Sequence, residues 1–74
     1  MHRHPSLKAL GQNLRRQREK GEFTQEKLGE LAELDPTYIS GIERGIRNPS
    51  VLSLLRIARA LGVTVARLVE GVDA

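Results

Sequence analysis

The sequence predicts a small all-α protein, a compact bundle of five helices, and three observations support this fold class. Apolar residues recur at spacings of three and four along most of the chain, which is the period of an amphipathic helix. No segment alternates apolar and polar residues over a useful length, so no strand is expected. Capping residues and glycines divide the 74 residues into five segments, a length that suits a single domain with one simple core.

The first helix is expected to begin at Ser6. Residues 1–5 show no apolar periodicity and end in a proline, so they are predicted to form a flexible basic arm. A serine hydroxyl can cap the first turn, and Gly21 is placed to end the helix. Its apolar stripe consists of Leu7, Leu10 and Leu14.

The second and third helices are separated by a short break. Thr24 can cap the second helix. At the break, Asp35 is a strong N-cap and Pro36 suits the first helical position, since its missing N–H would have no partner there. Gly45 can end the third helix in the left-handed conformation. A turn this short forces two helices to cross steeply, which predicts a helix-turn-helix, although helix lengths alone also fit any compact helical bundle.

Two further helices complete the chain. Ser50 is placed to cap the fourth helix, which Gly62 closes, and Thr64 can cap a short fifth helix that ends at Gly71. The predicted domain organisation is therefore an arm of residues 1–5, a helix-turn-helix domain of residues 6–71 and a frayed C-terminus of residues 72–74.

The composition excludes several classes of function. There is no cysteine, which rules out disulfides, thiolate metal sites and cysteine nucleophiles. Both histidines, His2 and His4, fall in the predicted arm, so we expect no enzyme, no metal site, no cofactor and no small-molecule ligand. Apolar runs are far shorter than the ~20 residues of a membrane span, and no N-terminal segment resembles a signal peptide. We therefore expect a soluble cytoplasmic protein without a membrane partner.

Charge is distributed unevenly along the chain, whose net charge is +3. Residues 1–20 carry six basic side chains and one acidic, residues 21–35 carry five acidic and one basic, and residues 36–60 carry four basic and one acidic. Such segregation can give the fold one basic face for a polyanion. Ordinary solvated helix surface explains the same distribution, so charge permits nucleic-acid binding without establishing it.

Four motifs in order resemble those of a known family. They are residues 24–28 (TQEKL), 38–45 (YISGIERG), 47–50 (RNPS) and 54–63 (LLRIARALGV). In these motifs the chain, from about Leu7 to Gly71, resembles the lambda repressor and Cro-like family, the XRE-type helix-turn-helix regulators. The string 37–44 is most similar to the controller proteins of restriction-modification systems. The resemblance implies a lambda repressor-like fold and a sequence-specific transcriptional regulator that binds double-stranded DNA.

The resemblance also implies roles for individual residues. It places the third helix in the major groove, where every base pair presents a distinct pattern of donors and acceptors. The implied base contacts are Thr37, Tyr38, Ser40 and, at a guanine edge, Arg47. The implied contacts to the sugar-phosphate backbone are Gln25, at the start of the second helix, and Arg44 and Asn48 in the loop after the third. Arg18 and Glu43 match positions that form an ion pair between the first and third helices.

Some of these positions have simpler explanations, and others depart from the family pattern. Tyr38 also fits a half-buried core ring, and the polar residues also fit solvated surface. Pro36 stands where relatives often carry a long polar side chain, and Gly41 has no side chain, so direct readout is thin and DNA shape is expected to contribute to specificity. Gln17 and Gly29 are expected to loosen the core, Gly29 by about 1 kcal/mol relative to alanine.

A homodimer is expected, because useful specificity normally comes from two reading heads on a two-fold site. The predicted dimer surface is the fifth helix with part of the fourth, where apolar groups are numerous: Val63, Val65, Leu68, Val69 and Val72. Two other functions remain open. One is a helical protein-interaction module that kept the fold and lost DNA binding, and the other is an antitoxin with a helix-turn-helix.

Overall fold

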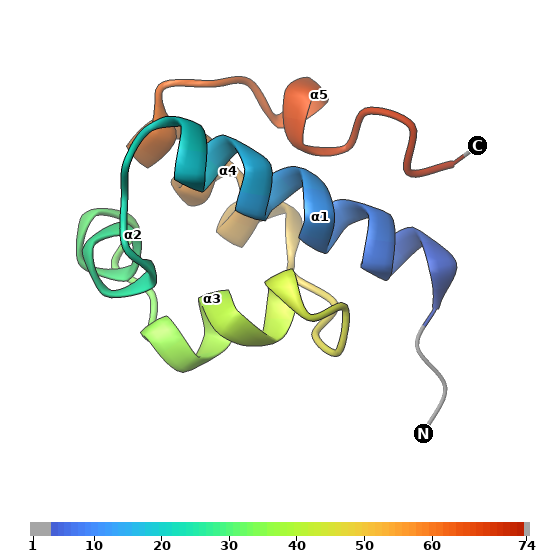
Figure 1. Ribbon diagram of the computed structural model, residues 1–74, viewed down its shortest axis with the longest axis horizontal. Coiled ribbons are helices and arrows are strands. Elements are labelled where there is room, and N and C mark those ends of the chain that lie inside the picture. Colours follow the sequence, from blue (N-terminus) through green and yellow to red (C-terminus); the bar gives the residue numbers. More distant parts are fainter. Residues whose placement is uncertain (1–3, 74) are drawn as a thin grey trace.

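A computed structural model describes residues 4–73, and within that range the chain is entirely helical, without strands. The five predicted helices are present as α1 (Pro5–Lys20), α2 (Gln25–Ala32), α3 (Pro36–Glu43), α4 (Val51–Leu61) and α5 (Val65–Leu68). Figure 1 shows α1 running across the molecule, with α3 on one side of it and α5 on the other, and α1 packs against both. None of these five helices combines the length and apolar character that crossing a bilayer requires.

The four N-caps predicted for the later helices are confirmed. The Thr24 hydroxyl accepts a hydrogen bond from the Lys27 N–H at 2.9 Å, and an Asp35 carboxylate oxygen accepts one from the Thr37 N–H at 2.7 Å. Ser50 and Thr64 accept equivalent bonds at 3.0 and 3.1 Å. These bonds satisfy N–H groups that have no partner inside the helix, so each helix start is determined locally.

The first helix begins two residues earlier than predicted, since its N-cap is His4 and not Ser6. Pro5 occupies the first helical turn, and His4 is the N-cap, with its Nδ1 accepting a hydrogen bond from the Ser6 N–H at 3.1 Å. Ser6 is therefore not the cap, and the predicted arm is wrong at its last two residues. Proline ends the arm by starting the helix, because its ring already holds the helical φ angle. The rest of the predicted arm, residues 1–3 with His2, lies outside the described residues.

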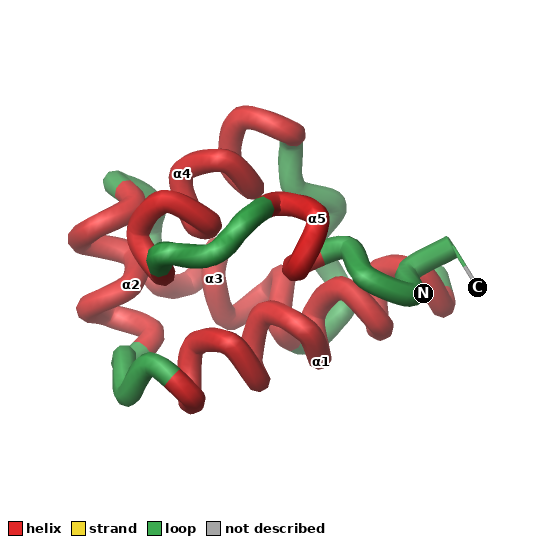
Figure 2. Tube along the Cα trace, turned by 90° about the horizontal axis from the view of Figure 1, so that it is seen from above, coloured by secondary structure: helices red, strands yellow, loops and turns green. Residues whose placement is uncertain are grey.

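The fifth helix is shorter than predicted, and the segment after it is attached to α1. It ends at Leu68, before Gly71. The Asn13 side-chain amide of α1 donates hydrogen bonds to the Leu68 and Glu70 carbonyl oxygens at 2.9 and 2.8 Å. Figure 2, which looks from above, shows this segment running along α1. Val72 is half-buried against the core, so the fraying predicted from residue 72 is wrong at that position; residue 74 lies outside the described range.

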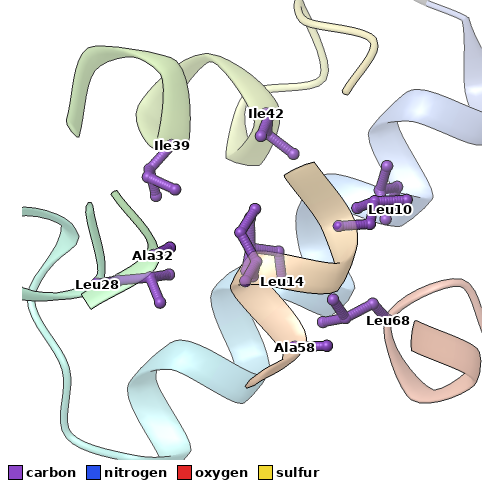
Figure 3. Packing of buried hydrophobic residues seen from close by; sticks show 10 residues of the cluster. Leu10, Leu14, Leu28, Ala32, Ile39, Ile42, Ala58 and Leu68 are labelled. Atoms are coloured by element: carbon purple, nitrogen blue, oxygen red, sulfur yellow. The ribbon is translucent and has the colours of Figure 1, made fainter. Parts of the chain in front are cut away.

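All five helices contribute to one hydrophobic core (Figure 3). Its largest fully buried side chains are Leu14, Leu28, Ile39, Ile42, Ile57 and Leu68. Among the described residues, no polar or charged residue is buried as a whole. Gln17 is only partly buried and lines an open hollow with Lys20 and Arg67, so it leaves no polar group inside the core.

Glycines allow close approach at one helix crossing and at the turn between α2 and α3. A Cβ on Gly11 of α1 would lie 2.4 Å from the Ile42 carbonyl oxygen of α3, and a Cβ on Gly29 of α2 would lie 2.5 Å from the Leu34 carbonyl oxygen. The expectation that Gly29 loosens the core is therefore wrong, because alanine would collide with the backbone of the turn that leads into α3. The two glycines hold α3 close to α1 and to the turn.

Candidate nucleic-acid interface

Helix α3 has a buried face and an outer face. Ile39 and Ile42 are fully buried, and these residues hold the helix against the core. Because side chains three, four and seven residues apart share a face of a helix, the opposite side presents one stripe. We call this stripe the outer face of α3; it consists of Thr37, Ser40, Gly41 and, at the C-cap, Arg44. Thr37 and Arg44 are exposed and Ser40 is half-buried.

The predicted ion pair between Arg18 and Glu43 is present. Arg18 Nε donates to Glu43 Oε2 at 2.6 Å, and Arg18 Nη2 donates to Glu43 Oε1 at 3.0 Å. The exposed fractions of the two side chains are 12% and 3%, so water competes little with this bidentate contact. The hydrogen bond to Glu43 raises the pKa of the Arg18 guanidinium, although burial opposes the shift. The pair therefore ties the end of the outer face to α1.

Gln25 takes part in the same network. Its amide Nε2 donates to Glu43 Oε1 at 3.1 Å. Arg18 Nη1 also donates to the Phe23 carbonyl oxygen at 2.8 Å, just before α2 begins. The last residue of α3 is thus connected to both α1 and the first residue of α2. The sequence predicted a phosphate contact for Gln25 and did not reveal its hydrogen bond to Glu43. At the start of α2, Gln25 has amide N–H groups for both contacts.

An open hollow between α2 and α3 brings predicted residues together with others that were not predicted. Gln25, Thr37 and Ser40 line it, as does Pro36. Glu26 and Glu30 line it too, one turn apart on α2. The carboxylates of Glu26 and Glu30 disfavour an anion on their side of the hollow, and the basic side chains at the carboxyl end of α3 are Arg44, at the C-cap, and Arg47, in the loop that follows.

The loop after α3 returns toward the helix through a Schellman motif. Gly45, with a φ of +75°, donates its N–H to the Ile42 carbonyl oxygen at 3.0 Å, and Ile46 donates to the Gly41 carbonyl oxygen at 3.0 Å. Arg47 and Asn48 follow directly and are exposed. The structure therefore brings both loop residues to the carboxyl end of α3, as expected from the sequence.

Tyr38 lies apart from the outer face. Its ring is half-buried and packs against the core, and its hydroxyl donates to Ser53 Oγ of α4 at 3.5 Å. The alternative raised for this residue, a half-buried ring, describes its position. A base contact by Tyr38 stays a prediction, and only the exposed edge of the ring is available for it.

The apolar surface differs from the predicted dimer surface. Leu68 is fully buried in the chain's own core, so its assignment to a dimer contact is wrong: the four-residue α5 folds back onto α1 and buries it. Val63, Val65 and Val72 are half-buried against the same core, and Val69 is 36% exposed.

The most exposed large apolar side chains were missed. They are Val51 and Leu52, 69% and 70% exposed at the start of α4. The signal was present in the sequence, because the buried stripe of α4 consists of Leu54, Ile57 and Ala58, and Val51 and Leu52 add apolar residues at the exposed start of the helix. Within residues 4–73, histidines and acidic residues do not gather in threes where a metal ion could bind.

Comparison with known proteins agrees with this geometry. A family model described as helix-turn-helix matches residues 14–68. The uncharacterized HTH-type transcriptional regulator y4dJ of Sinorhizobium fredii is 39% identical over 66 residues, which cover 89% of this chain and 86% of the relative. The crystal structure of the restriction-modification controller protein C.AhdI from Aeromonas hydrophila has a TM-score of 0.86 at 38% identity and covers 88% of this chain and 98% of that chain.

A DNA complex is also among the similar structures. The master regulator for biofilm formation SinR, in a crystal structure with DNA, has a TM-score of 0.79 at 31% identity and covers 82% of this chain and 98% of that chain. Both the predicted fold and the predicted resemblance are confirmed. The chain belongs to the XRE-type helix-turn-helix family of DNA-binding transcriptional regulators.

Proposed function

We propose that the chain is a sequence-specific regulator that inserts the outer face of α3 into the major groove of double-stranded DNA and acts as a homodimer on a two-fold operator. The observation that carries this proposal is the two-sided character of α3. Buried Ile39 and Ile42 hold one side, while Thr37 and Arg44 project from the other. A rigid helix with hydroxyl and basic groups on its free side suits base-edge recognition.

The size of α3 fits the groove. An α-helix with its side chains is about 10–12 Å across, and the major groove is about 12 Å wide. The eight residues of α3 extend about 12 Å along the groove. The hydroxyls of Thr37 and Ser40 donate to or accept from base edges, and the Thr37 methyl packs against a thymine methyl. The loop residue Arg47 supplies the paired donors that match guanine N7 and O6. Tyr38 is the base contact with the least geometric support, since its ring belongs to the core surface.

Contacts to the DNA backbone orient this reading helix. Arg44 and Asn48 are exposed at the carboxyl end of α3, and Gln25 stands at the first position of α2, where unpaired N–H groups attract a phosphate. The bond from Gln25 to Glu43 leaves the second amide N–H of Gln25 for that phosphate. A phosphate bound there would be connected through Glu43 to the orientation of α3.

A second copy of the chain is the partner we propose for the exposed apolar side chains at the start of α4, Val51 and Leu52. One reading head of this size covers a small DNA site, and two heads about 34 Å apart contact successive major grooves. Both side chains are about 70% exposed, and adjacent exposed apolar side chains are typical of a surface that contacts another protein. Sedimentation equilibrium at tens of micromolar tests the dimer, and a monomer at that concentration counts against it.

The likeness to a restriction-modification controller supports a narrower role, in which the protein regulates the operon that encodes it. This role involves no catalytic step, and we propose that the chain has no enzyme activity. It also places the protein with the DNA, which in bacterial relatives is in the cytoplasm.

The experiment is fluorescence anisotropy with the duplex upstream of the protein's own gene and a scrambled duplex of equal length, titrated over several salt concentrations. A specific regulator prefers the native duplex by ~10³ or more, with a log–log salt slope of about −4 to −8 from several phosphate contacts. Equal, weak binding to both duplexes contradicts autoregulation. Failure to bind any duplex contradicts DNA binding and favours the interaction module.

A further inference from the structure

Gly41 interrupts the outer face of α3, and helix geometry does not explain why. It lies inside an eight-residue helix and has an ordinary helical backbone, so alanine would favour the helix more. Thr37 lies four residues before it and Arg44 three residues after it, so a side chain at position 41 would stand midway along the stripe that faces the DNA. Gly41 is nevertheless buried.

The side chain of Arg47 covers it. The three heavy atoms nearest to a Cβ placed on Gly41 all belong to Arg47: Cγ at 2.5 Å, Nε at 3.4 Å and Cδ at 3.5 Å. At the other two glycines inside helices, Gly11 and Gly29, the nearest atom is a backbone carbonyl oxygen instead. Position 41 is thus the place where an arginine stem crosses the recognition helix.

The loop geometry holds Arg47 at this place. The hydrogen bond from the Ile46 N–H to the Gly41 carbonyl oxygen, 3.0 Å long, joins the residue before Arg47 directly to Gly41. Within residues 4–73, the Arg47 guanidinium forms no hydrogen bond or ion pair to the rest of the chain, so its donors are available to a ligand. The side chain is therefore held at its stem and free at its tip.

We propose that Gly41 is a positioning residue for DNA readout: its bare backbone seats the stem of Arg47, which delivers the guanidinium to the outer face of α3 between Thr37 and Arg44, where it reads a guanine. This inference rests on the proposed function and adds a specificity device to it. A side chain from the loop takes the place of the one that α3 lacks. The planar fork of arginine matches guanine N7 and O6, which explains why an arginine occupies the seat.

The test begins with selection of the preferred duplex from a random pool by the wild-type chain. Affinities for that duplex, and for copies with 7-deazaguanine at each guanine, are then measured for wild type, Gly41→Ala, Arg47→Ala and the double variant. Gly41→Ala is expected to stay folded with a change in Tm below about 5 °C, because displacing Arg47 Cγ from the new methyl group offsets the higher helix propensity of alanine. It is also expected to weaken binding about tenfold and to abolish the response to one guanine. In the Arg47→Ala background it adds less than about a twofold loss.

Two further variants complete the design. Arg47→Lys keeps a positive charge but not the fork, so it should lose the guanine response and keep the salt slope. Arg59→Ala removes an exposed arginine from α4 and should leave the guanine response unchanged. A wild type that selects no sequence overturns the proposed function and this inference together. A wild type that selects a sequence overturns the inference alone if Gly41→Ala unfolds, keeps the guanine response, or weakens binding equally with and without Arg47.

Discussion

The crossing of α1 and α3 makes a sharp prediction about stability, because Gly11 stands where the two helices touch. A Cβ there would lie 2.4 Å from the Ile42 carbonyl oxygen and 2.5 Å from the Glu43 carbonyl oxygen. Ordinary contact begins at 3.4 Å, so Gly11→Ala requires the helices to separate by about 1 Å. Strain of ~3 kcal/mol from overpacking, reduced by ~1 kcal/mol from the higher helix propensity of alanine, lowers the free energy of unfolding by about 2 kcal/mol.

Urea and thermal unfolding followed by far-ultraviolet circular dichroism measure this loss. For a chain of this size, about 2 kcal/mol corresponds to a fall in Tm of roughly 10 °C. Gly41→Ala is the matched control: it makes the same substitution inside a helix, but the atoms nearest to the new methyl group belong to the side chain of Arg47 instead of to backbone. Gly41→Ala should therefore cost much less stability than Gly11→Ala. If Gly11→Ala is as stable as the wild type, the closeness of this crossing does not constrain the fold and the reasoning fails.

Three further changes are expected to alter stability. Glu33→Gly keeps the left-handed backbone at φ 57° but removes the steric cost of a Cβ there, so it should stabilise the chain by up to about 1 kcal/mol, read from the urea midpoint; a loss would show that Glu33 is not strained. Asn13→Ala removes two hydrogen bonds to the segment after α5 and should cost about 2 kcal/mol, with faster amide exchange confined first to that segment. Arg18→Met leaves the Glu43 carboxylate without its cation and should cost about 3 kcal/mol in chemical denaturation, and a cost under ~1 kcal/mol would contradict the role given to the pair.

The helix starts were predictable because each depends on a few neighbouring residues. Thr24 and Asp35 cap their helices through bonds that span two or three residues, so residue type and spacing carry the necessary information. Pro36 follows the same local logic. The start of α1 was misplaced because proline fits both an irregular arm and a first helical turn, and only the bond from Ser6 to His4 distinguishes them.

The burial of the C-terminal segment was not predictable, because it depends on contacts between residues far apart in the chain. Leu68 has an apolar side chain on a very short helix, which is equally consistent with a dimer contact and with a core residue. Asn13 decides between them by holding the Leu68 carbonyl from 55 residues away. The residues of α5 themselves give no indication of that hydrogen bond.

In the candidate site too, some features were predictable from the sequence and others depend on how the helices pack. The Arg18–Glu43 pair was predicted from family resemblance and is present, whereas the bond from Gln25 to Glu43 depends on how α2 approaches α3 and was missed. Arg47 and Asn48 were expected in the loop after the third helix from the family resemblance, and the Schellman motif at Gly45 is what brings them to the end of α3. The sequence predicted little direct readout because Pro36 and Gly41 bring no polar side chain of their own, and it did not show that a loop side chain lies over Gly41.

Three glycines inside helices show that the effect of a glycine depends on the atoms that face it in the fold. Helix propensity treats Gly11, Gly29 and Gly41 alike and predicts that alanine would stabilise each by about 1 kcal/mol. The atoms facing them differ: backbone carbonyls at the first two, and the stem of Arg47 at the third. Backbone cannot yield without moving a helix, so the first two glycines are required by the fold. A side chain yields more readily than backbone, so replacing Gly41 should cost DNA specificity more than it costs stability.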